Sequence, residues 1–291
     1  MTPETLTLAN GPLRFTATAM GAGPLVILIH GFPDTRDTFA AQLPALAEAG
    51  FRAVAVSTRG YEPSSQPEDG DYHAHALASD VIAWIDALGE KSAHLVGHDW
   101  GATIAFAACA LAPDRIASLS VLAVPHPARF AESYLADPAQ QARSGYILGF
   151  MSPDAEAMIT ADDCAYLEEL WCAWSPGWMF SVEHIGAMTR AMKMPGVPTA
   201  ALSYYRQALD TVSDAGQASQ ALIAGPFIVP TLGLTGDKDG CISADVFEAS
   251  MRDADFPGSL KVERIMGAGH FLHREVPDLV NDRLICWMRR H

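Results

Sequence analysis

The chain has 291 residues, of which 49% are hydrophobic and 18% are charged, and its formal net charge is −15 at pH 7. This length is sufficient to bury the core of one α/β domain that carries an insertion. The acidic balance argues against nucleic acid and anionic membrane surfaces as partners, and no apolar run is long enough to span a membrane.

The N-terminal residues lack the basic and apolar regions of a signal peptide. The five cysteines are widely spaced and form no CxxC pair, so we expect reduced thiols in a cytoplasmic protein. The sequence contains neither a dinucleotide-binding fingerprint nor a phosphate-binding loop, so no cofactor is expected. No metal site is expected either, and whether the chain forms a homodimer is left open.

The first part of the chain alternates between strand and helix signals. Segments 5–9 and 13–19 alternate weakly around a Gly-Pro turn and predict an opening hairpin. Apolar runs predict strands, and helical spacing follows most of them. The runs lie at 25–29, 53–56, 93–96 and 118–124, and the helical spacing lies at about 38–49, 74–88 and 102–112. This alternation predicts a parallel sheet with helices on both faces.

The pattern changes after Val124, and strand-like apolar runs are missing from about 126 to 226. Helix-like segments in this stretch lie at 155–173, 182–192 and 200–209. The alternation then returns, with strands expected at 227–234 and 260–265 and helices near 245–253 and 277–289. We therefore expect a core domain made of residues 1–125 and 227–291, with residues 126–226 inserted as a helical cap.

The stretch Gly97-His98-Asp99-Trp100-Gly101-Ala102 joins a predicted strand to a predicted helix. Small residues around one central side chain are typical of a nucleophile elbow, because the tight turn crowds the backbone. The central residue of such a turn is usually Ser, and here it is Asp99. A carboxylate attacks saturated carbon well and gains little by attacking a carbonyl, so the substitution points to alkyl transfer.

Three further motifs follow predicted strands. His30-Gly31-Phe32-Pro33 can turn the Phe32 N–H towards the elbow, where it forms an oxyanion hole with the N–H of Trp100. Asp239 lies in a Gly-rich turn after a late strand and can orient a histidine. His270 follows two glycines after the last strand. The order Asp99, Asp239, His270 completes a sequence of nucleophile, acid and base.

Together with Arg59-Gly60-Tyr61, these motifs resemble those of the α/β-hydrolase fold, and more narrowly those of its epoxide hydrolases and haloalkane dehalogenases. The resemblance covers essentially the whole chain and implies a mostly parallel sheet flanked by helices, with a helical cap after the sixth strand. It also implies a covalent mechanism. Asp99 forms an alkyl-enzyme ester, Asp239 holds His270, and His270 activates the water that hydrolyses the ester.

An epoxide oxygen leaves as a basic alkoxide, so epoxide hydrolases use tyrosines of the cap as proton donors. Leu202-Ser203-Tyr204-Tyr205-Arg206 resembles the cap motif Asn-Trp/Tyr-Tyr-Arg of that family, with Ser203 in place of Asn, and this implies Tyr205 as one donor. Tyr146 lies where the second donor is expected. Other residues expected to contact substrate are His30, Trp100, Phe150 and Trp178, with His30 serving mainly as a structural hydrogen-bonding group.

The sequence thus predicts an epoxide hydrolase for a small apolar epoxide. A haloalkane dehalogenase with the same three residues is the alternative, although such enzymes typically carry Asn after the His-Gly pair, where this chain has Phe32. An alternative from another class is a non-catalytic α/β-hydrolase that binds a ligand.

Overall fold

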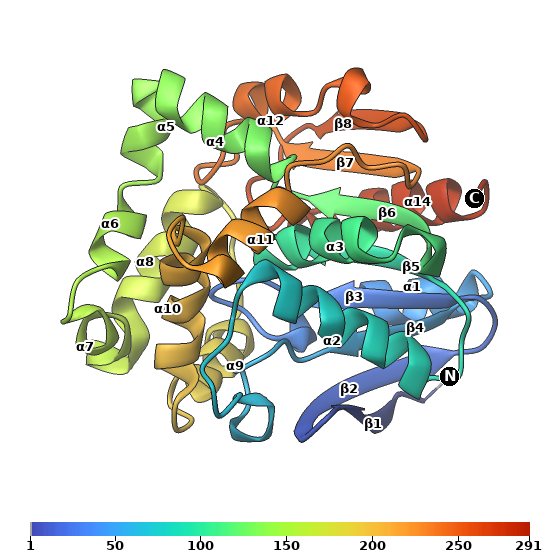
Figure 1. Cartoon of the computed structure of the whole chain (residues 1–291), viewed down its shortest axis with the longest axis horizontal. Helices are drawn as coiled ribbons and strands as arrows, with labels where there is room; N and C mark the ends of the chain where they lie inside the picture. Colours follow the sequence, from blue (N-terminus) through green and yellow to red (C-terminus); the bar gives the residue numbers. More distant parts are fainter. Residues whose placement is uncertain (1) are drawn as a thin grey trace.

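A computed structural model describes residues 2–291 and contains one eight-stranded sheet with helices on both faces (Figure 1). The strand order is β1-β2-β4-β3-β5-β6-β7-β8. The β1–β2 and β2–β4 pairs are antiparallel, and the other pairs are parallel. The strands are β1 (Glu4–Asn10), β2 (Leu13–Gly21), β3 (Leu25–Ile29), β4 (Arg52–Val56), β5 (Ala93–His98), β6 (Ile116–Leu122), β7 (Thr231–Gly236) and β8 (Leu260–Ile265). The predicted hairpin and the predicted mostly parallel sheet are confirmed.

The centre of the sheet explains why its strands are apolar throughout. All five residues of β3 are buried, and Ile27 lies opposite Val54 of β4 and Leu95 of β5. Strands that are covered on both faces have no solvent side, so alternation with polar residues is lost. The carboxyl ends of these parallel strands all meet at one edge of the sheet, where the predicted motifs follow.

Helices cover the two faces of the sheet with separate apolar clusters. One face carries α2 (Ala74–Ala87), α3 (Trp100–Leu111) and α12 (Ala244–Ser250), and the other carries α1 (Gln42–Glu48) and α14 (Pro277–Met288). The remaining short elements are η1 (Arg36–Phe39), η2 (Pro63–Ser65), η3 (Pro113–Arg115), η5 (Asp253–Asp255) and α13 (Leu272–Glu275). Across the described chain, no helix combines the length and apolar character needed to cross a membrane.

Between β6 and β7 the chain forms a series of helices, which we call the inserted segment (residues 126–226). Most of these helices gather beside the carboxyl ends of the parallel strands, at the left of Figure 1. They are α4 (Pro127–Ala136), α5 (Pro138–Arg143), α6 (Tyr146–Phe150), α7 (Ala155–Thr160), η4 (Ala161–Cys164), α8 (Ala165–Trp174), α9 (Val182–Met192), α10 (Val197–Ala208) and α11 (Asp214–Leu222). The expected insertion after the sixth strand is confirmed, whereas its definition as a cap domain with these boundaries stays a prediction.

Three predicted elements differ from the structure. The helical segment expected at about 38–49 is divided into η1 and α1. The helix expected over 155–173 is interrupted, because Asp162 and Asp163 adopt left-handed backbone angles within η4. Aspartate tolerates this region better than most residues, since its short side chain bonds locally. The strand expected over 227–234 begins only at Thr231, directly after Pro230, which has no N–H to donate to a neighbouring strand.

Candidate active site

Asp99 lies on the sharp turn between β5 and α3. Its φ of 54° and ψ of −123° are strained for a residue other than glycine. Gly101 makes this turn sterically feasible, because a Cβ at that position would lie 1.9 Å from the Ile29 carbonyl oxygen. The turn therefore presents the Asp99 side chain at the carboxyl edge of the sheet, where it is only 5% exposed.

The two carboxylate oxygens of Asp99 have different neighbours. Oδ1 accepts a hydrogen bond of 2.7 Å from the Phe32 N–H, and Oδ2 lies 3.5 Å from Nε2 of His270. Gly31 allows this approach, since a Cβ there would lie 2.3 Å from Oδ1 and 2.6 Å from the Trp100 nitrogen. The Phe32 N–H therefore binds the carboxylate, and the Trp100 nitrogen lies nearby at the start of α3. Their joint role as an oxyanion hole stays a prediction.

His270 and Asp239 form a fully buried pair. Nδ1 of His270 lies 2.9 Å from Oδ2 of Asp239, and neither side chain is exposed. The other oxygen of Asp239 accepts hydrogen bonds from the N–H groups of Cys241 and Ile242, at 2.7 Å and 3.0 Å. Burial alone lowers the pKa of His270, but the charges of Asp239 and Asp99 outweigh burial and raise the pKa to about 10.

Two tyrosines of the inserted segment lie close enough to Asp99 for its charge to affect both phenols. The Tyr205 hydroxyl is buried and has no hydrogen-bond partner within residues 2–291, while the Tyr146 hydroxyl lies 3.6 Å from the Cys241 sulfur. The two rings are 6.0 Å apart between centroids. Burial is the main cause that raises the pKa of both phenols, and the nearby charge of Asp99 adds to it. Both hydroxyls consequently stay protonated and remain hydrogen-bond donors.

Comparisons with known proteins agree with this geometry. The family described as alpha/beta hydrolase fold matches residues 24–276. The chain is 31% identical to epoxide hydrolase A of Mycobacterium tuberculosis, over 97% of this chain and 96% of that protein. It is 30% identical to an epoxide hydrolase of Caballeronia sordidicola, over 97% of this chain and 92% of that one.

The chain belongs to the epoxide hydrolase family of α/β hydrolases. A solved structure agrees: epoxide hydrolase A of Mycobacterium thermoresistibile superposes with a TM-score of 0.81 at 25% identity, covering 99% of this chain and 98% of that one. Nearly the whole fold, including the inserted segment, is therefore shared with this epoxide hydrolase.

Four other residues of this epoxide hydrolase family member were predicted to contact substrate, and they form two groups. Phe150 is buried, and its ring centroid lies 5.0 Å from Tyr205 and 5.3 Å from Phe32. Trp100 is also close, at 5.0 Å from the Tyr205 ring. Both rings therefore form part of the wall beside the two tyrosines.

His30 and Trp178 form the second group, because neither contacts Tyr205 as Phe150 and Trp100 do. Both ring nitrogens of His30 are engaged, Nδ1 with the Gly31 carbonyl and Nε2 with Thr58. This agrees with the structural role expected for His30 and leaves it no free polar atom for a substrate. Trp178 lies in a separate stack with Trp171, Phe271 and the Arg274 guanidinium, so its substrate contact stays a prediction.

Sequence reasoning missed two neighbours of the site. The Trp174 ring lies 5.2 Å from the His270 ring and 5.1 Å from the Tyr146 ring. Trp174 was not among the residues predicted to contact the substrate. Cys241 had no assigned role, although its position two residues after Asp239 places it at the site. Among the described residues, no group of three or more His, Cys, Asp or Glu side chains is arranged to hold a metal ion.

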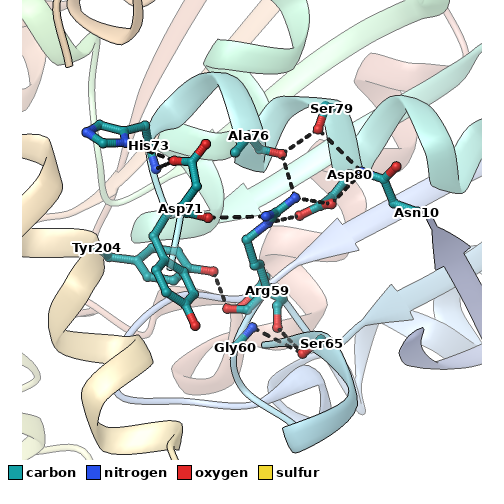
Figure 2. A network of polar contacts seen from close by, with 12 residues as sticks. Asn10, Arg59, Gly60, Ser65, Asp71, His73, Ala76, Ser79, Asp80 and Tyr204 are labelled. Atoms are coloured by element: carbon teal, nitrogen blue, oxygen red, sulfur yellow. Dashed lines mark hydrogen bonds and ion pairs between the residues drawn. The ribbon is translucent and has the colours of Figure 1, made fainter. Parts of the chain in front are cut away.

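Helix α10, which carries Tyr205, rests on the loop that contains Arg59. Figure 2 shows the Arg59 guanidinium bound by both oxygens of Asp80, at 2.7 Å and 2.8 Å, while the Tyr204 hydroxyl donates to the Arg59 carbonyl at 2.7 Å. Asn10 donates to the same Asp80 carboxylate. A buried, bidentate ion pair fixes a backbone more firmly than an exposed one. The loop is therefore a rigid support for Tyr204 and, through it, for Tyr205.

Proposed function

We propose that the protein converts an epoxide to a vicinal diol through an ester on Asp99. The observation that carries this proposal is the Asp99 carboxylate, which accepts a hydrogen bond from the Phe32 N–H and lies 3.5 Å from the His270 imidazole, with two buried phenols near enough to sense its charge. Its membership of the epoxide hydrolase family supports a hydrolase that acts on the ether bond of an epoxide. The surrounding Phe32, Phe150 and Tyr205 rings favour a neutral, apolar substrate.

The first step uses the free oxygen of Asp99. Oδ1 is bound to the Phe32 N–H, so Oδ2 attacks an epoxide carbon while the bond between that carbon and the ring oxygen breaks. The developing alkoxide is very basic and takes up a proton from a tyrosine hydroxyl. Tyr205 is the better placed donor because its hydroxyl is not committed to another group within residues 2–291.

The second step uses His270 as the base. Its Nε2 removes a proton from water, which attacks the ester carbon of Asp99. The negative charge then develops on Oδ1, next to the Phe32 and Trp100 N–H groups. Collapse of this intermediate breaks the ester bond, and the proton on His270 passes to the departing diol oxygen. Asp99 is left as a carboxylic acid that holds the second proton of the water, and transfer of this proton to the tyrosinate restores both the carboxylate and the phenol. Because the ester carries no charge, one of the two carboxylates that raise the His270 pKa is removed at the moment when the imidazole must be neutral.

The test is to stop the reaction at the ester. The His270→Gln variant should open styrene oxide once and then keep the adduct on Asp99, which intact mass spectrometry and peptide mapping detect. The exposed His75 offers a matched control, because His75→Gln should turn over like the wild type. A wild type that forms diol while His270→Gln forms no adduct would contradict the covalent mechanism.

The same assay separates the alternative activities. Release of chloride or bromide from haloalkanes without diol formation from epoxides would assign the site to dehalogenation. Absence of turnover with both substrate classes, together with ligand binding that Asp99→Ala leaves unchanged, would point to a non-catalytic binding protein.

A further inference from the structure

The loop that carries Asp239 also contacts the helices that carry Tyr146. We call residues 239–243 the acid loop. Gln140 of α5 is 1% exposed and uses its whole amide group on this contact. Its Nε2 donates to the Cys241 carbonyl at 2.8 Å and to Ser144 Oγ at 3.0 Å, and its Oε1 accepts from the Ser243 N–H at 3.1 Å. A buried amide with all these bonds made holds the two segments at a fixed separation.

Cys241 adds a side-chain contact to this backbone attachment. Its N–H donates to Asp239 Oδ1 at 2.7 Å, and its sulfur lies 3.6 Å from the Tyr146 hydroxyl oxygen. Arg143 of α5 donates to the carbonyl oxygens of Asp239 and Gly240, at 3.3 Å and 3.4 Å. The acid loop thus contains Asp239, the acid of the proposed triad, and contacts the second tyrosine, Tyr146, through Cys241.

We propose that Gln140 and Cys241 are positioning residues, which hold Tyr146 over Asp99 and direct its hydroxyl proton towards the substrate. This inference rests on the proposed function and deepens it. Either group of this contact can be the donor, and we assign the weak donation to the thiol, with the phenol oxygen as acceptor. The phenol proton is then free to point towards an epoxide oxygen, and the accepted bond makes the phenol a stronger donor. Gln140 fixes the backbone from which both groups extend.

The two tyrosines differ in this respect, which makes the proposal testable. The Tyr205 hydroxyl has no partner within the described chain, whereas Tyr146 has the thiol. Removing the thiol should therefore affect only the contribution of Tyr146. The main-chain bond from Cys241 to Asp239 survives any change of side chain, so the support of His270 should be unaffected.

The test measures epoxide opening and ester hydrolysis separately in single-turnover experiments. Cys241→Ala should slow opening about threefold to tenfold, the effect of losing one hydrogen bond, and leave hydrolysis unchanged. Cys241→Ser should restore most of the rate because a donor returns. Cys241→Ala should add nothing in a Tyr146→Phe background but have its full effect in a Tyr205→Phe background. Cys172→Ala is the matched control, because Cys172 is exposed.

Several results would overturn the inference. They are an opening rate that Cys241→Ala leaves unchanged or raises, a loss that persists in the Tyr146→Phe background, or a loss confined to ester hydrolysis. Gln140→Leu should slow opening as well, whereas Gln141→Leu at the neighbouring exposed position should not. Equal effects of the two glutamine variants would remove Gln140 from the proposal.

A measurement without turnover separates this inference from the proposed function. With 3-fluorotyrosine at position 146, Cys241→Ala should shift the fluorine resonance, and with the label at position 205 the shift should be much smaller. A wild type that opens no epoxide would contradict the proposed function. An unshifted resonance at position 146 would contradict the positioning role, whatever the activity.

Discussion

The two halves of the site are held in different ways. In the core half, Asp239 is bound by two backbone N–H groups, and the main chain of His270 donates to the Trp174 carbonyl and accepts from the His98 ring. In the inserted half, Tyr205 is held mainly by ring contacts, with centroids 5.0 Å from Trp100 and from Phe150. Backbone bonds at strand ends permit little adjustment, whereas packed rings can shift.

Substitutions in the two halves should therefore have effects of different size on the reaction. Loss of a core group removes a step of the reaction, because no neighbour can replace it. Loss of a group in the inserted half should slow one step and leave the other intact.

Asp99→Ala should give the largest effect. Without a carboxylate no ester forms, and loss of a nucleophile lowers turnover by about 10⁴-fold or more in comparable enzymes. Steady-state diol formation and a thermal unfolding curve would check this result. Asp237→Ala is the control. Asp237 lies on the same turn as Asp239, but its carboxylate bonds only to the Gly267 N–H. Comparable losses of diol formation in the two variants would contradict the role of Asp99 as the nucleophile.

Gly31→Ala tests the core half through its backbone. The new Cβ would lie 2.3 Å from Asp99 Oδ1 and 2.6 Å from the Trp100 nitrogen, so the carboxylate and the oxyanion hole must separate. We expect kcat/KM to fall by about 10²–10³-fold, which is the effect of losing an oxyanion-hole donor. Gly186→Ala in α9 is the control, since the nearest atom to its Cβ is the flexible end of Arg190 at 3.1 Å. Full activity in Gly31→Ala would show that the core half does adjust.

The pH dependence of ester hydrolysis sharpens the assignment of His270. Asp239 and Asp99 raise its pKa to about 10 in the free protein, against the effect of burial. In the ester the charge of Asp99 is gone, so the hydrolysis rate should rise with pH to a midpoint below about 10. Below that midpoint it should fall about tenfold per pH unit. Ester decay in single turnovers between pH 5 and pH 10 measures this. A midpoint at or above 10 would mean that Asp99 does not act on the His270 pKa.

Tyr205→Phe tests the inserted half. We expect epoxide opening to slow by about 10²-fold, as for loss of a general acid, while ester hydrolysis is unchanged. The buried hydroxyl makes no strong hydrogen bond among residues 2–291, although the Trp100 side chain lies within its reach, so its removal should change the free energy of unfolding by less than about 1 kcal/mol. Tyr134→Phe, on α4 and partly exposed, is the control. An equal loss in both chemical steps would contradict the division between the two halves.

Much of the core half could be predicted from the sequence, because its groups follow strands. Asp99, Asp239 and His270 each come after an apolar run, and parallel strands bring their carboxyl ends together. The bounds of β3 and β8 agree with the predicted strands. The chemical roles of these residues remain proposals that the experiments above address.

The inserted half could be predicted only in part, because side-chain contacts between distant residues leave no periodic signal. Gln140 and Cys241 are 101 residues apart, and nothing in their local sequence indicates the bond between them. The aromatic residues predicted to contact the substrate included Trp178 but not Trp174. Trp174 ends helix α8 beside His270, whereas Trp178 lies beyond the helix end in another stack.

Tyr204→Phe should give the smallest effect and contrasts two neighbours on helix α10. The Tyr204 hydroxyl donates to the Arg59 carbonyl at 2.7 Å and is buried, so its loss leaves that carbonyl with one partner fewer. We expect a loss of about 1 kcal/mol in the free energy of unfolding and a modest slowing of epoxide opening, because Tyr205 moves with the helix. Tyr204→Phe should therefore destabilise the fold more than Tyr205→Phe in the same denaturant titration. If Tyr204→Phe costs no more stability than Tyr205→Phe, the bond from Tyr204 to the Arg59 carbonyl does not support helix α10, and the support of Tyr205 by the Arg59 loop has to be reconsidered.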